Sequence, residues 1–361
     1  MEENYIDKLK DNSMKIVLAG FFLTAMSVAV FTAFQTSEDS GSQLQEVFYT
    51  GGEGPQERAE VYKYSDSDSG EPVVMVPGLG LDEYIYTDTP DGREGWAQIF
   101  DENGYTSYVY NPPNIVDSNE TVNDSMSVSQ WSLGRAWSKW GFGPQQGEAY
   151  EDSKYPVPQI QELENNFPQY TSGISGGQTS GSGSQTDRTG GQRGGQFEGN
   201  FSGQKGGQQS GRSGQGSAQG GGMSFGSEAS TEALIDLLER TGPATVIVHS
   251  AEGATGFEVA RERAELIETL VAVEPVGCPE TESQVFNGTE FVAVYGDYVQ
   301  ERGQTGRKQA CEATVEMINQ NGGDAEMISL PDMGIEGNSH LLMQGENNEE
   351  IAQKVMEELE G

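Results

Sequence analysis

The sequence predicts an α/β fold in which a mostly parallel sheet is covered by helices on both faces. The second half of the chain contains short apolar segments, which are typical of strands buried on both sides. These strands are expected at 244–250, 270–275, 291–297 and 325–331. Helical patterns follow three of them, near 254–267, 304–320 and 347–360. Strands that alternate with helices indicate a parallel sheet, and 361 residues suffice for one large domain of this kind.

The first half of the chain continues the same alternation. Segments 59–64 and 72–77 have strand patterns, and the acidic turn between them predicts a hairpin. A helix is expected over 94–104 and a further strand over 105–113. The remaining helical patterns lie at 129–140, 157–167 and 230–242.

The chain is strongly acidic, with 57 Asp and Glu against 20 Lys and Arg and a formal net charge of −37. This charge would repel a phosphate backbone, so the sequence argues against nucleic-acid binding. The acidic residues are spread over the expected helices and loops and are not gathered in one tail. Because dense salt screens repulsion between surface charges, we interpret the composition as that of a halophilic protein.

The N-terminal region contains an apolar run over 16–34 that has no charge and no proline. About 19 apolar residues are just enough to span a bilayer, and the lysines before the run place residues 1–15 in the cytoplasm. The run exceeds a usual signal-peptide core, which favours an uncleaved transmembrane anchor over a removed signal segment. Residues 35–46 form a polar tether. The domain at 47–361 is then expected outside the cytoplasm, anchored to the membrane or secreted if the run is cleaved.

A segment at about 171–226 interrupts this domain with a sequence made almost entirely of Gly, Ser and Gln. Such a composition buries too little apolar surface to offset the entropy lost on ordering, so we expect disorder there. Strand and helix patterns on its two sides complete one another. We therefore interpret the segment as a flexible insertion within one domain.

The segment TVIVHSAEGATG, at 245–256, is the strongest candidate for a reactive site. A β-branched strand runs into a tight turn at Ser250 and then into a helix, which is the layout of a nucleophile elbow. The usual signature G-x-S-x-G is incomplete, because Val248 and Glu252 occupy the two glycine positions. A carboxylate at position 252 is expected to depress reactivity unless it points into solvent.

A nucleophilic serine needs a base, normally a histidine, and the sequence has two histidines. His249 adjoins Ser250, so in extended backbone its side chain points to the opposite face. His340 lies in a loop that returns to the carboxyl edge of the sheet, and it is the expected base. The acid that orients this histidine is either Glu274 or Asp297, since each ends a predicted strand and satisfies the chain order Ser, acid, His.

An oxyanion hole needs two backbone N–H donors. Ala251, directly after the serine, is expected to supply one. The second is expected from Leu79, with Gly78 or Leu81 as alternatives, in the loop VPGLGLDE. Gly78 and Gly80 allow the backbone of this loop to bend close to a substrate.

Cys278 and Cys311 are the two cysteines of the chain. Outside the cytoplasm, two cysteines on separate elements are expected to form a disulfide, and two free thiols are the alternative. With two histidines and no Cys-x-x-Cys pair, the sequence does not predict a metal cluster, and no cofactor is expected.

The most specific motifs of the chain are TPDGREGW, at 89–96, and GNSHLLMQGENN, at 337–348. Together with VHSAEGA around the serine, they resemble a small family of atypical α/β-hydrolase esterases. The resemblance extends over about 47–360, apart from the insertion. It implies the α/β-hydrolase fold.

This family uses a serine–glutamate–histidine triad, so the resemblance implies Ser250 as nucleophile, Glu274 as acid and His340 as base. It thereby favours Glu274 over Asp297. Its members carry a small helical cap, which the resemblance places at 128–170. The family also has cysteines at the positions of Cys278 and Cys311, which supports the disulfide.

These expectations describe an extracytoplasmic serine hydrolase that cleaves a small-molecule carboxylic ester through an acyl-enzyme. The alternative is a hydrolase-fold binding or structural protein at the cell surface whose site has decayed. Glu252 favours that alternative, while the intact set of serine, glutamate and histidine opposes it. The oligomeric state and the identity of the ester are left open by the sequence.

Overall fold

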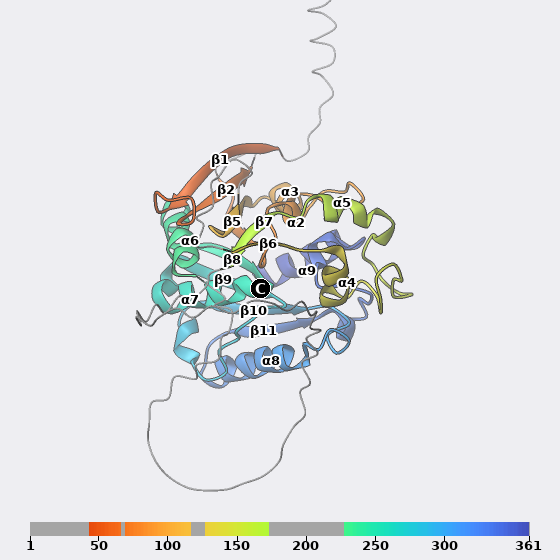
Figure 1. Cartoon of the computed structure of the whole chain (residues 1–361). Helices are drawn as coiled ribbons and strands as arrows, with labels where there is room; N and C mark the ends of the chain where they lie inside the picture. Colours follow the sequence, from red (N-terminus) through yellow and green to blue (C-terminus); the bar gives the residue numbers. More distant parts are fainter. Residues whose placement is uncertain (1–42, 66–68, 117–126, 173–226, 361) are drawn as a thin grey trace, which may run out of the picture.

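The central sheet has eight strands in the order β1-β2-β4-β3-β8-β9-β10-β11. The computed structural model describes residues 43–65, 69–116, 127–172 and 227–360 (Figure 1). From β4 to β11 all neighbouring strands are parallel, so the predicted mostly parallel sheet is confirmed. The strands span Leu44–Gly51 (β1), Arg58–Tyr64 (β2), Pro72–Val76 (β3), Thr106–Asn111 (β4), Ala244–His249 (β8), Ile267–Val273 (β9), Glu290–Tyr295 (β10) and Ala325–Ser329 (β11).

Strand β2 departs from the parallel order, since it is antiparallel to both β1 and β4. The predicted hairpin between β2 and β3 is wrong, because β4 lies between these two strands. The sequence of β3, PVVMV, explains the difference. Four of its five residues are buried, so β3 is more stable inside the sheet, between β4 and β8, than in an isolated pair with β2.

Helices cover both faces of the sheet, as predicted. Helices α6, α7 and α8 pack with one set of strand residues, and α3 and α9 pack with the other (Figure 1). Ser227 caps α6 by accepting a hydrogen bond from the backbone of Ser230, and Gly242 ends this helix. The helices span Tyr84–Thr87 (α2), Trp96–Glu102 (α3), Leu133–Trp140 (α4), Ile160–Asn165 (α5), Glu228–Thr241 (α6), Gly253–Arg263 (α7), Thr305–Gln320 (α8) and Asn348–Leu359 (α9).

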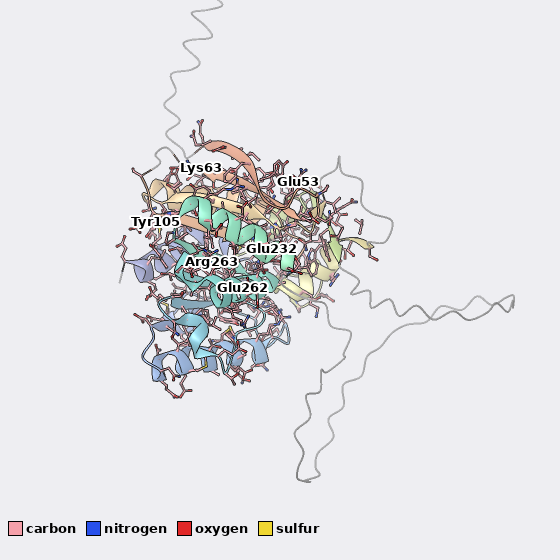
Figure 2. All side chains as sticks on the ribbon, turned by 90° about the vertical axis from the view of Figure 1, so that its left-hand side faces the viewer. Glu53, Lys63, Tyr105, Glu232, Glu262 and Arg263 are labelled. Atoms are coloured by element: carbon pink, nitrogen blue, oxygen red, sulfur yellow. A yellow bond between two sulfur atoms is a disulfide. The ribbon has the colours of Figure 1, made fainter. Side chains whose placement is uncertain are left out.

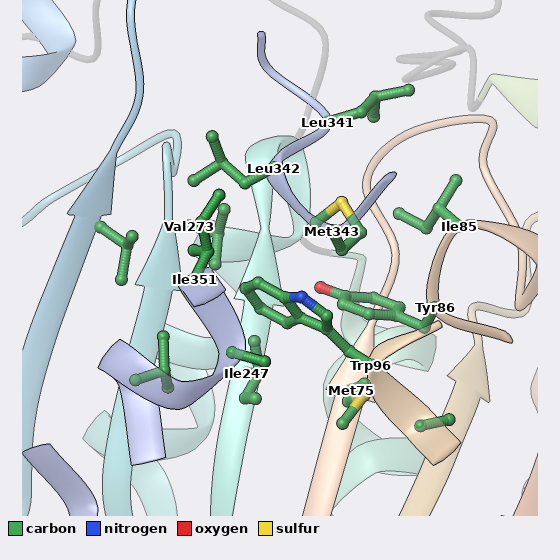
Figure 3. Packing of buried hydrophobic residues seen from close by; sticks show 14 of the residues in the cluster. Met75, Ile85, Tyr86, Trp96, Ile247, Val273, Leu341, Leu342, Met343 and Ile351 are labelled. Atoms are coloured by element: carbon green, nitrogen blue, oxygen red, sulfur yellow. The ribbon is translucent and has the colours of Figure 1, made fainter. Parts of the chain in front are cut away.

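The pleat of β8 separates two apolar cores. Ile247 points into the core shared with α3 and α9, whereas Val246 and Val248 point into the core shared with α6 and α7. In the first core the indole of Trp96 lies beside the ring of Tyr86 (Figure 3). The same figure shows Met343 next to these rings, and Leu341 and Leu342 belong to the same core. The backbone that leads away from His340 is therefore fixed by the core.

The segment between β4 and α6 contains more than the helical cap that the resemblance implies. Helices α4 and α5 lie there, but so do strands β6 (Ser127–Gln130) and β7 (Gln169–Ser172). These two strands pair with β5 (Ile115–Val116) in a separate three-stranded antiparallel sheet. The strands were missed because they are short and polar on the exposed side.

The N-terminal segments at 1–15 and 16–34 and the core of the insertion, 173–226, lie outside the described residues. Strand β1 begins at Leu44, so the last residues of the expected tether belong to the sheet. Across the described ranges, no helix combines the length and the apolar character that crossing a bilayer requires.

Candidate active site

Ser250 lies at the point where β8 ends and the helical segment leading into α7 begins. Its φ angle is +55°, in the left-handed region that a non-glycine residue adopts only when the surrounding structure holds it there. Ser250 lines a cavity at this turn. This is the strand–turn–helix geometry that the sequence predicts.

The incomplete G-x-S-x-G signature has a packing explanation. Val248 is fully buried, so this position is filled by core packing. The glycines that the turn needs lie further on. A Cβ on Gly253 would lie 2.5 Å from Cβ of Pro275, and one on Gly256 would lie 2.8 Å from Val248. The close approach of α7 to β8 and to the segment after β9 therefore requires glycine at 253 and 256.

His340 connects the serine with the acid. Its Nε2 lies 2.9 Å from Oγ of Ser250, and its Nδ1 lies 2.5 Å from Oε2 of Glu274. A carboxylate can only accept, so Nδ1–H donates to Glu274 and the lone pair of Nε2 faces the serine hydroxyl. The three side chains meet at the carboxyl edge of the sheet, although they are 66 and 90 residues apart along the chain.

Glu274 follows β9 and is held in place by Arg302, a residue that the sequence analysis missed. Nη2 of Arg302 donates to Oε1 of Glu274 at 2.8 Å, and Nη1 lies 2.6 Å from Oε2. Both side chains are almost completely buried. Burial alone would raise the pKa of Glu274, but the charge of Arg302 and the hydrogen bond from His340 outweigh it and lower the pKa to about 2. Glu274 is thus ionised at any pH at which the protein is expected to work.

The alternative acid, Asp297, is turned away from the imidazole. Its Oδ2 accepts a hydrogen bond from the backbone N–H of Asn338 at 2.8 Å, and its own N–H donates to the carbonyl of Asn338. Asp297 therefore fixes the loop that carries His340 without bonding to the ring. Of the two candidate acids, the structure brings Glu274 to the histidine.

His249 also serves the histidine loop. Its Nε2 lies 3.1 Å from the carbonyl oxygen of His340, and the two rings are 4.5 Å apart. As expected from strand geometry, it does not bond to Ser250. Burial lowers the pKa of His249 well below its usual value, and the neighbouring His340 lowers it further. His249 is thus neutral and acts on the loop through one hydrogen bond.

Burial also lowers the pKa of His340, and this effect outweighs the opposing influence of Glu274. Arg302 and Arg307 add to the decrease through their charge. A neutral imidazole beside a serine hydroxyl is the state that can accept a proton. At neutral pH, His340 is therefore in the form that can accept the proton of the Ser250 hydroxyl.

The loop between β3 and α2 lies directly against the serine. A Cβ on Gly78 would lie 2.8 Å from Cβ of Ser250, so this position admits only glycine. Leu79 and Ala251, the two expected N–H donors, both line the cavity with the serine. The first N–H groups of a helix have no partner inside it, which leaves the N–H of Ala251 available at the start of the helical segment.

Glu252 is buried and does not point into solvent. Its carboxyl accepts a hydrogen bond from Oγ1 of Thr255 at 2.5 Å, and burial raises its pKa to about 7. Glu252 is also not among the described residues that line the cavity. The side chain therefore neither faces solvent nor faces the place where an oxyanion would form.

The two most specific sequence motifs contact each other and hold the histidine loop. Arg93 donates to the carbonyl of Gly345 at 2.8 Å and to Oδ1 of Asn348 at 2.5 Å. Asn348 in turn donates to the carbonyl of Glu94 at 2.8 Å, and Nε1 of Trp96 donates to the carbonyl of Asn348 at 2.9 Å. These bonds join the segment before α3 to the segment after His340.

A disulfide joins Cys278, in the loop after β9, to Cys311 of α8. It closes a sequence separation of 33 residues. This stretch contains both β10 and Arg302, so the covalent bond restrains the part of the chain that positions the acid.

The cavity above Ser250 has a volume of about 220 Å³. Its floor is formed by Ser250, Ala251 and His340, and its walls come from the loop after β3, from α4 and its approach, and from the start of α8. Trp131 closes one wall, because its Nε1 donates to the carbonyl of Leu79 at 2.8 Å. Ligand pockets for drug-sized molecules are usually about 300–1,000 Å³, so this site suits a small molecule.

No protein-family model matches the chain. The chain is 24% identical, over 412 aligned positions, to a protein of Fungal sp. (strain ATCC 74256) named "Probable secreted lipase phiG", with 95% of this chain and 97% of that protein covered. Among solved structures it is similar to a bacterial esterase known at atomic resolution, with a TM-score of 0.65 and 21% identity over 88% of this chain and 94% of that chain.

The chain has the α/β-hydrolase fold. In α/β-hydrolases the reactive serine sits on a strained turn between a central strand and a helix, and a backbone N–H from an earlier loop faces it. Ser250 occupies that turn in this chain, and the loop around Leu79 occupies the place of the earlier loop.

Proposed function

We propose that the protein is an extracytoplasmic serine hydrolase that cleaves small carboxylic esters through an acyl-enzyme. The observation that carries the proposal is the continuous chain of hydrogen bonds from Ser250 through His340 to Glu274 at the floor of a small cavity. The similarity to a protein named as a lipase and to a bacterial esterase supports the same reaction class.

In the proposed reaction, Oγ of Ser250 attacks the ester carbonyl carbon and its proton passes to Nε2 of His340. Glu274 stabilises the imidazolium that forms. The carbonyl oxygen becomes an oxyanion, which accepts hydrogen bonds from the N–H groups of Leu79 and Ala251. When the C–O bond of the ester breaks, the imidazolium gives its proton to the leaving alcohol.

The second half of the reaction repeats these steps with water. His340 takes a proton from a water molecule, whose oxygen attacks the acyl carbon on Ser250. The second tetrahedral intermediate then releases the carboxylic acid, and His340 returns the proton to Oγ of Ser250. Atoms and charges balance without a cofactor.

A fluorophosphonate probe tests the nucleophile. The full chain is expected to be labelled and to hydrolyse small esters, while Ser250→Ala abolishes both. Ser138→Ala, which removes an exposed hydroxyl on α4, serves as the matched control and keeps the labelling. Because the net charge is −37, the assay is run over a range of salt up to molar concentration.

Absence of both labelling and hydrolysis, in a chain shown to be folded at each salt concentration, contradicts the proposal. That result supports the alternative, a hydrolase-fold binding protein with a decayed site. Glu252 was the reason to consider that alternative. The position of Glu252 away from the cavity weakens this alternative.

Separate substitution of the two carboxylates tests the acid. Glu274→Gln is expected to lower kcat by about 10⁴, by analogy with the loss of the acid in serine proteases. Asp297→Asn removes a carboxylate that does not touch the ring and is expected to lower kcat far less. A larger loss of kcat for Asp297→Asn than for Glu274→Gln overturns the assignment of Glu274 as the acid.

The proposed location rests on the apolar run at 16–34 and on the similarity to a protein named as secreted. The full chain is expected to stay with the membrane fraction after alkaline extraction, and a chain that begins after residue 34 is expected to be released. If the full chain is also released, the run acts as a cleaved signal or has no targeting role, and sequencing of the mature N-terminus separates these two cases.

A further inference from the structure

The surface of this protein is acidic in most places where it is hollowed. The cavity between α6 and α7, for example, is lined by four glutamates and one arginine among its charged residues. Figure 2 shows Glu232 and Glu262 on this face, with Arg263 beside them. Such a surface repels anions, as expected from a net charge of −37.

The cavity above Ser250 has the opposite character. No Asp or Glu is among the described residues that line it, although acidic residues outnumber basic ones by 57 to 20 in the chain. Its lining contains four cationic side chains, which are Arg135, Lys139, Arg302 and Arg307. A cluster of this kind is unexpected in so acidic a protein unless it serves a ligand.

Arg302 is neutralised by Glu274, but the other three cations have no carboxylate partner among the described residues. Arg135 lies over the ring of Trp131, with its guanidinium carbon 4.3 Å from the ring centroid. This contact holds the guanidinium at the cavity without cancelling its charge. By contrast, other cations on the surface form ion pairs, such as Arg240 with Asp236 and Lys354 with Glu357.

Arg307 is the most informative of the three. It is half-buried and belongs to the first turn of α8, where the helix dipole disfavours a cation. Burial lowers the pKa of Arg307, and the charge of Arg302 adds to this decrease, which outweighs the opposing influence of Tyr295 and Glu274. Its charge also reaches His340, whose pKa it lowers. The placement thus costs stability in the free protein, and a bound anion would offset that cost.

We infer that the substrate is a small ester that also carries a carboxylate, bound by Arg307 together with Arg135 and Lys139 while its ester carbonyl lies at Ser250. The inference rests on the proposed function and narrows it to one substrate class. A cavity of about 220 Å³ has room for the ester and the carboxylate of a short molecule. The acidic surface elsewhere directs such an anion to this site alone.

Two pairs of esters test the inference, each matched in size and different in charge. Monoethyl adipate and its neutral carboxamide analogue, ethyl adipamate, place the charge on the acyl side. The esters 4-(butanoyloxy)benzoate and 4-(butanoyloxy)benzamide place it on the alcohol side. The readout is the ratio of kcat/KM for the anionic ester to kcat/KM for its neutral partner, at the lowest salt at which the chain is folded.

The wild-type ratio is expected to exceed about 10 in at least one pair, because a charged hydrogen bond is worth roughly one to two powers of ten in binding. Arg307→Gln is expected to lower this ratio about 10- to 100-fold, and Arg307→Lys to restore part of it. Arg135→Gln and Lys139→Gln lower it less, because both side chains are exposed to solvent.

Lys308→Gln is the matched control. It removes one positive charge from the neighbouring position of α8, but Lys308 lines a different cavity and bonds to Ser329. It is expected to leave the ratio unchanged. Added salt is expected to lower the wild-type ratio, because screening weakens the attraction of the exposed cations.

The possible failures are distinguishable. If neutral esters are hydrolysed and the ratio is near or below 1 in both pairs, the inference is wrong while the proposed function stands. A ratio that Arg307→Gln and Lys308→Gln lower equally reflects overall charge and also overturns the inference. If no ester is hydrolysed and the fluorophosphonate does not react, the proposed function itself fails.

Discussion

Arg302 contacts both carboxylate oxygens of Glu274, one of which also accepts from His340, and the Arg302–Glu274 pair is almost completely buried. A glutamate at the end of a strand has several rotamers, and this geometry selects the one that faces the imidazole. The guanidinium also donates to the carbonyl of Asp297 at 3.1 Å, so it joins the ends of β9 and β10. Arg302 is therefore a positioning residue for the proposed acid.

Replacement of Arg302 is expected to damage both stability and activity. Arg302→Gln leaves a buried carboxylate without its charge partner, which costs about 3–5 kcal/mol in the free energy of unfolding. Arg302 also lowers the pKa of His340, so its removal is expected to shift the acid limb of the kcat/KM profile to higher pH. A purely structural role would not move this limb. Arg302→Lys keeps the charge and is expected to leave the limb closer to that of the wild type.

The control for this prediction is Arg261→Gln, which breaks two exposed ion pairs, with Glu258 and Glu282, and is expected to cost about 1 kcal/mol or less. Denaturant unfolding and the pH profile are measured on the same preparations. Equal acid limbs for wild type and Arg302→Gln would show that the guanidinium does not act on the imidazole.

The pH dependence of the wild type follows from the state of His340. Only the neutral imidazole can take the proton of Ser250, so activity is lost as pH falls through the pKa of His340. Because burial lowers this pKa, the midpoint of the acid limb of kcat/KM is expected below 6.5, the value for a free histidine. The measurement uses a neutral ester, so that the charge of the substrate does not change with pH. A midpoint above 6.5 would show that Glu274 dominates over burial.

Local patterns were sufficient to predict the fold and to mark Ser250 as the candidate nucleophile, because both depend on segments that are contiguous in the sequence. Buried strands alternate with helices along the chain, and Ser250 sits at one strand end. The hairpin prediction failed because pairing between strands is not local. Strand β1 was missed because most of its side chains are exposed and its sequence is mixed.

The contacts around the candidate site were harder to predict than the candidate residues themselves. Residue patterns alone did not separate Glu274 from Asp297, and the resemblance to a family favoured the former. Arg302 follows β10 in a loop, and no local pattern marks it as the partner of a carboxylate on a neighbouring strand. The only signal was a cation close to the same strand edge in a chain with few cations. The burial of Glu252 was equally invisible, because a polar pattern predicts exposure.

Glu252 is expected to make the folded state less stable as pH rises. Burial raises its pKa from 4.5 to about 7 in the folded chain. Its stabilising contribution is thus fully present below pH 4.5, where both states bind the proton, and is lost as pH rises towards 7. The loss amounts to about 3 kcal/mol in the free energy of unfolding.

Glu252→Gln removes this dependence while keeping an oxygen that can accept from Thr255. The variant is expected to match the wild type near pH 4 and to be more stable by about 3 kcal/mol above pH 7. Glu262→Gln, on the exposed face of α7, controls for the loss of one negative charge from an acidic surface. A difference between Glu252→Gln and wild type that does not change with pH would show that folding does not shift the pKa of Glu252.

The disulfide is expected to stabilise the chain mainly by restricting its unfolded state. Closing a loop of about 33 residues is worth roughly 3–4 kcal/mol. Cys278→Ser with Cys311→Ser is therefore expected to lower the free energy of unfolding by this amount. The measurement is denaturant unfolding of the double variant and of the wild type with and without a reductant, and equal stability in all three would contradict the prediction.

The contact between the two sequence motifs is expected to matter for activity more than its distance from the serine suggests. Asn348 accepts from Arg93 and donates to the carbonyl of Glu94, and its own carbonyl accepts from Trp96. Asn348→Ala removes the two side-chain bonds and leaves the half-buried guanidinium of Arg93 short of one partner. We expect the free energy of unfolding to fall by about 1–3 kcal/mol. We also expect kcat to fall, because the histidine loop loses its anchor at 345–348.

Asn321→Ala removes an exposed asparagine at the end of α8 and serves as the control. If both variants keep the wild-type kcat while Asn348→Ala alone loses stability, the motif contact holds the fold but not the position of His340.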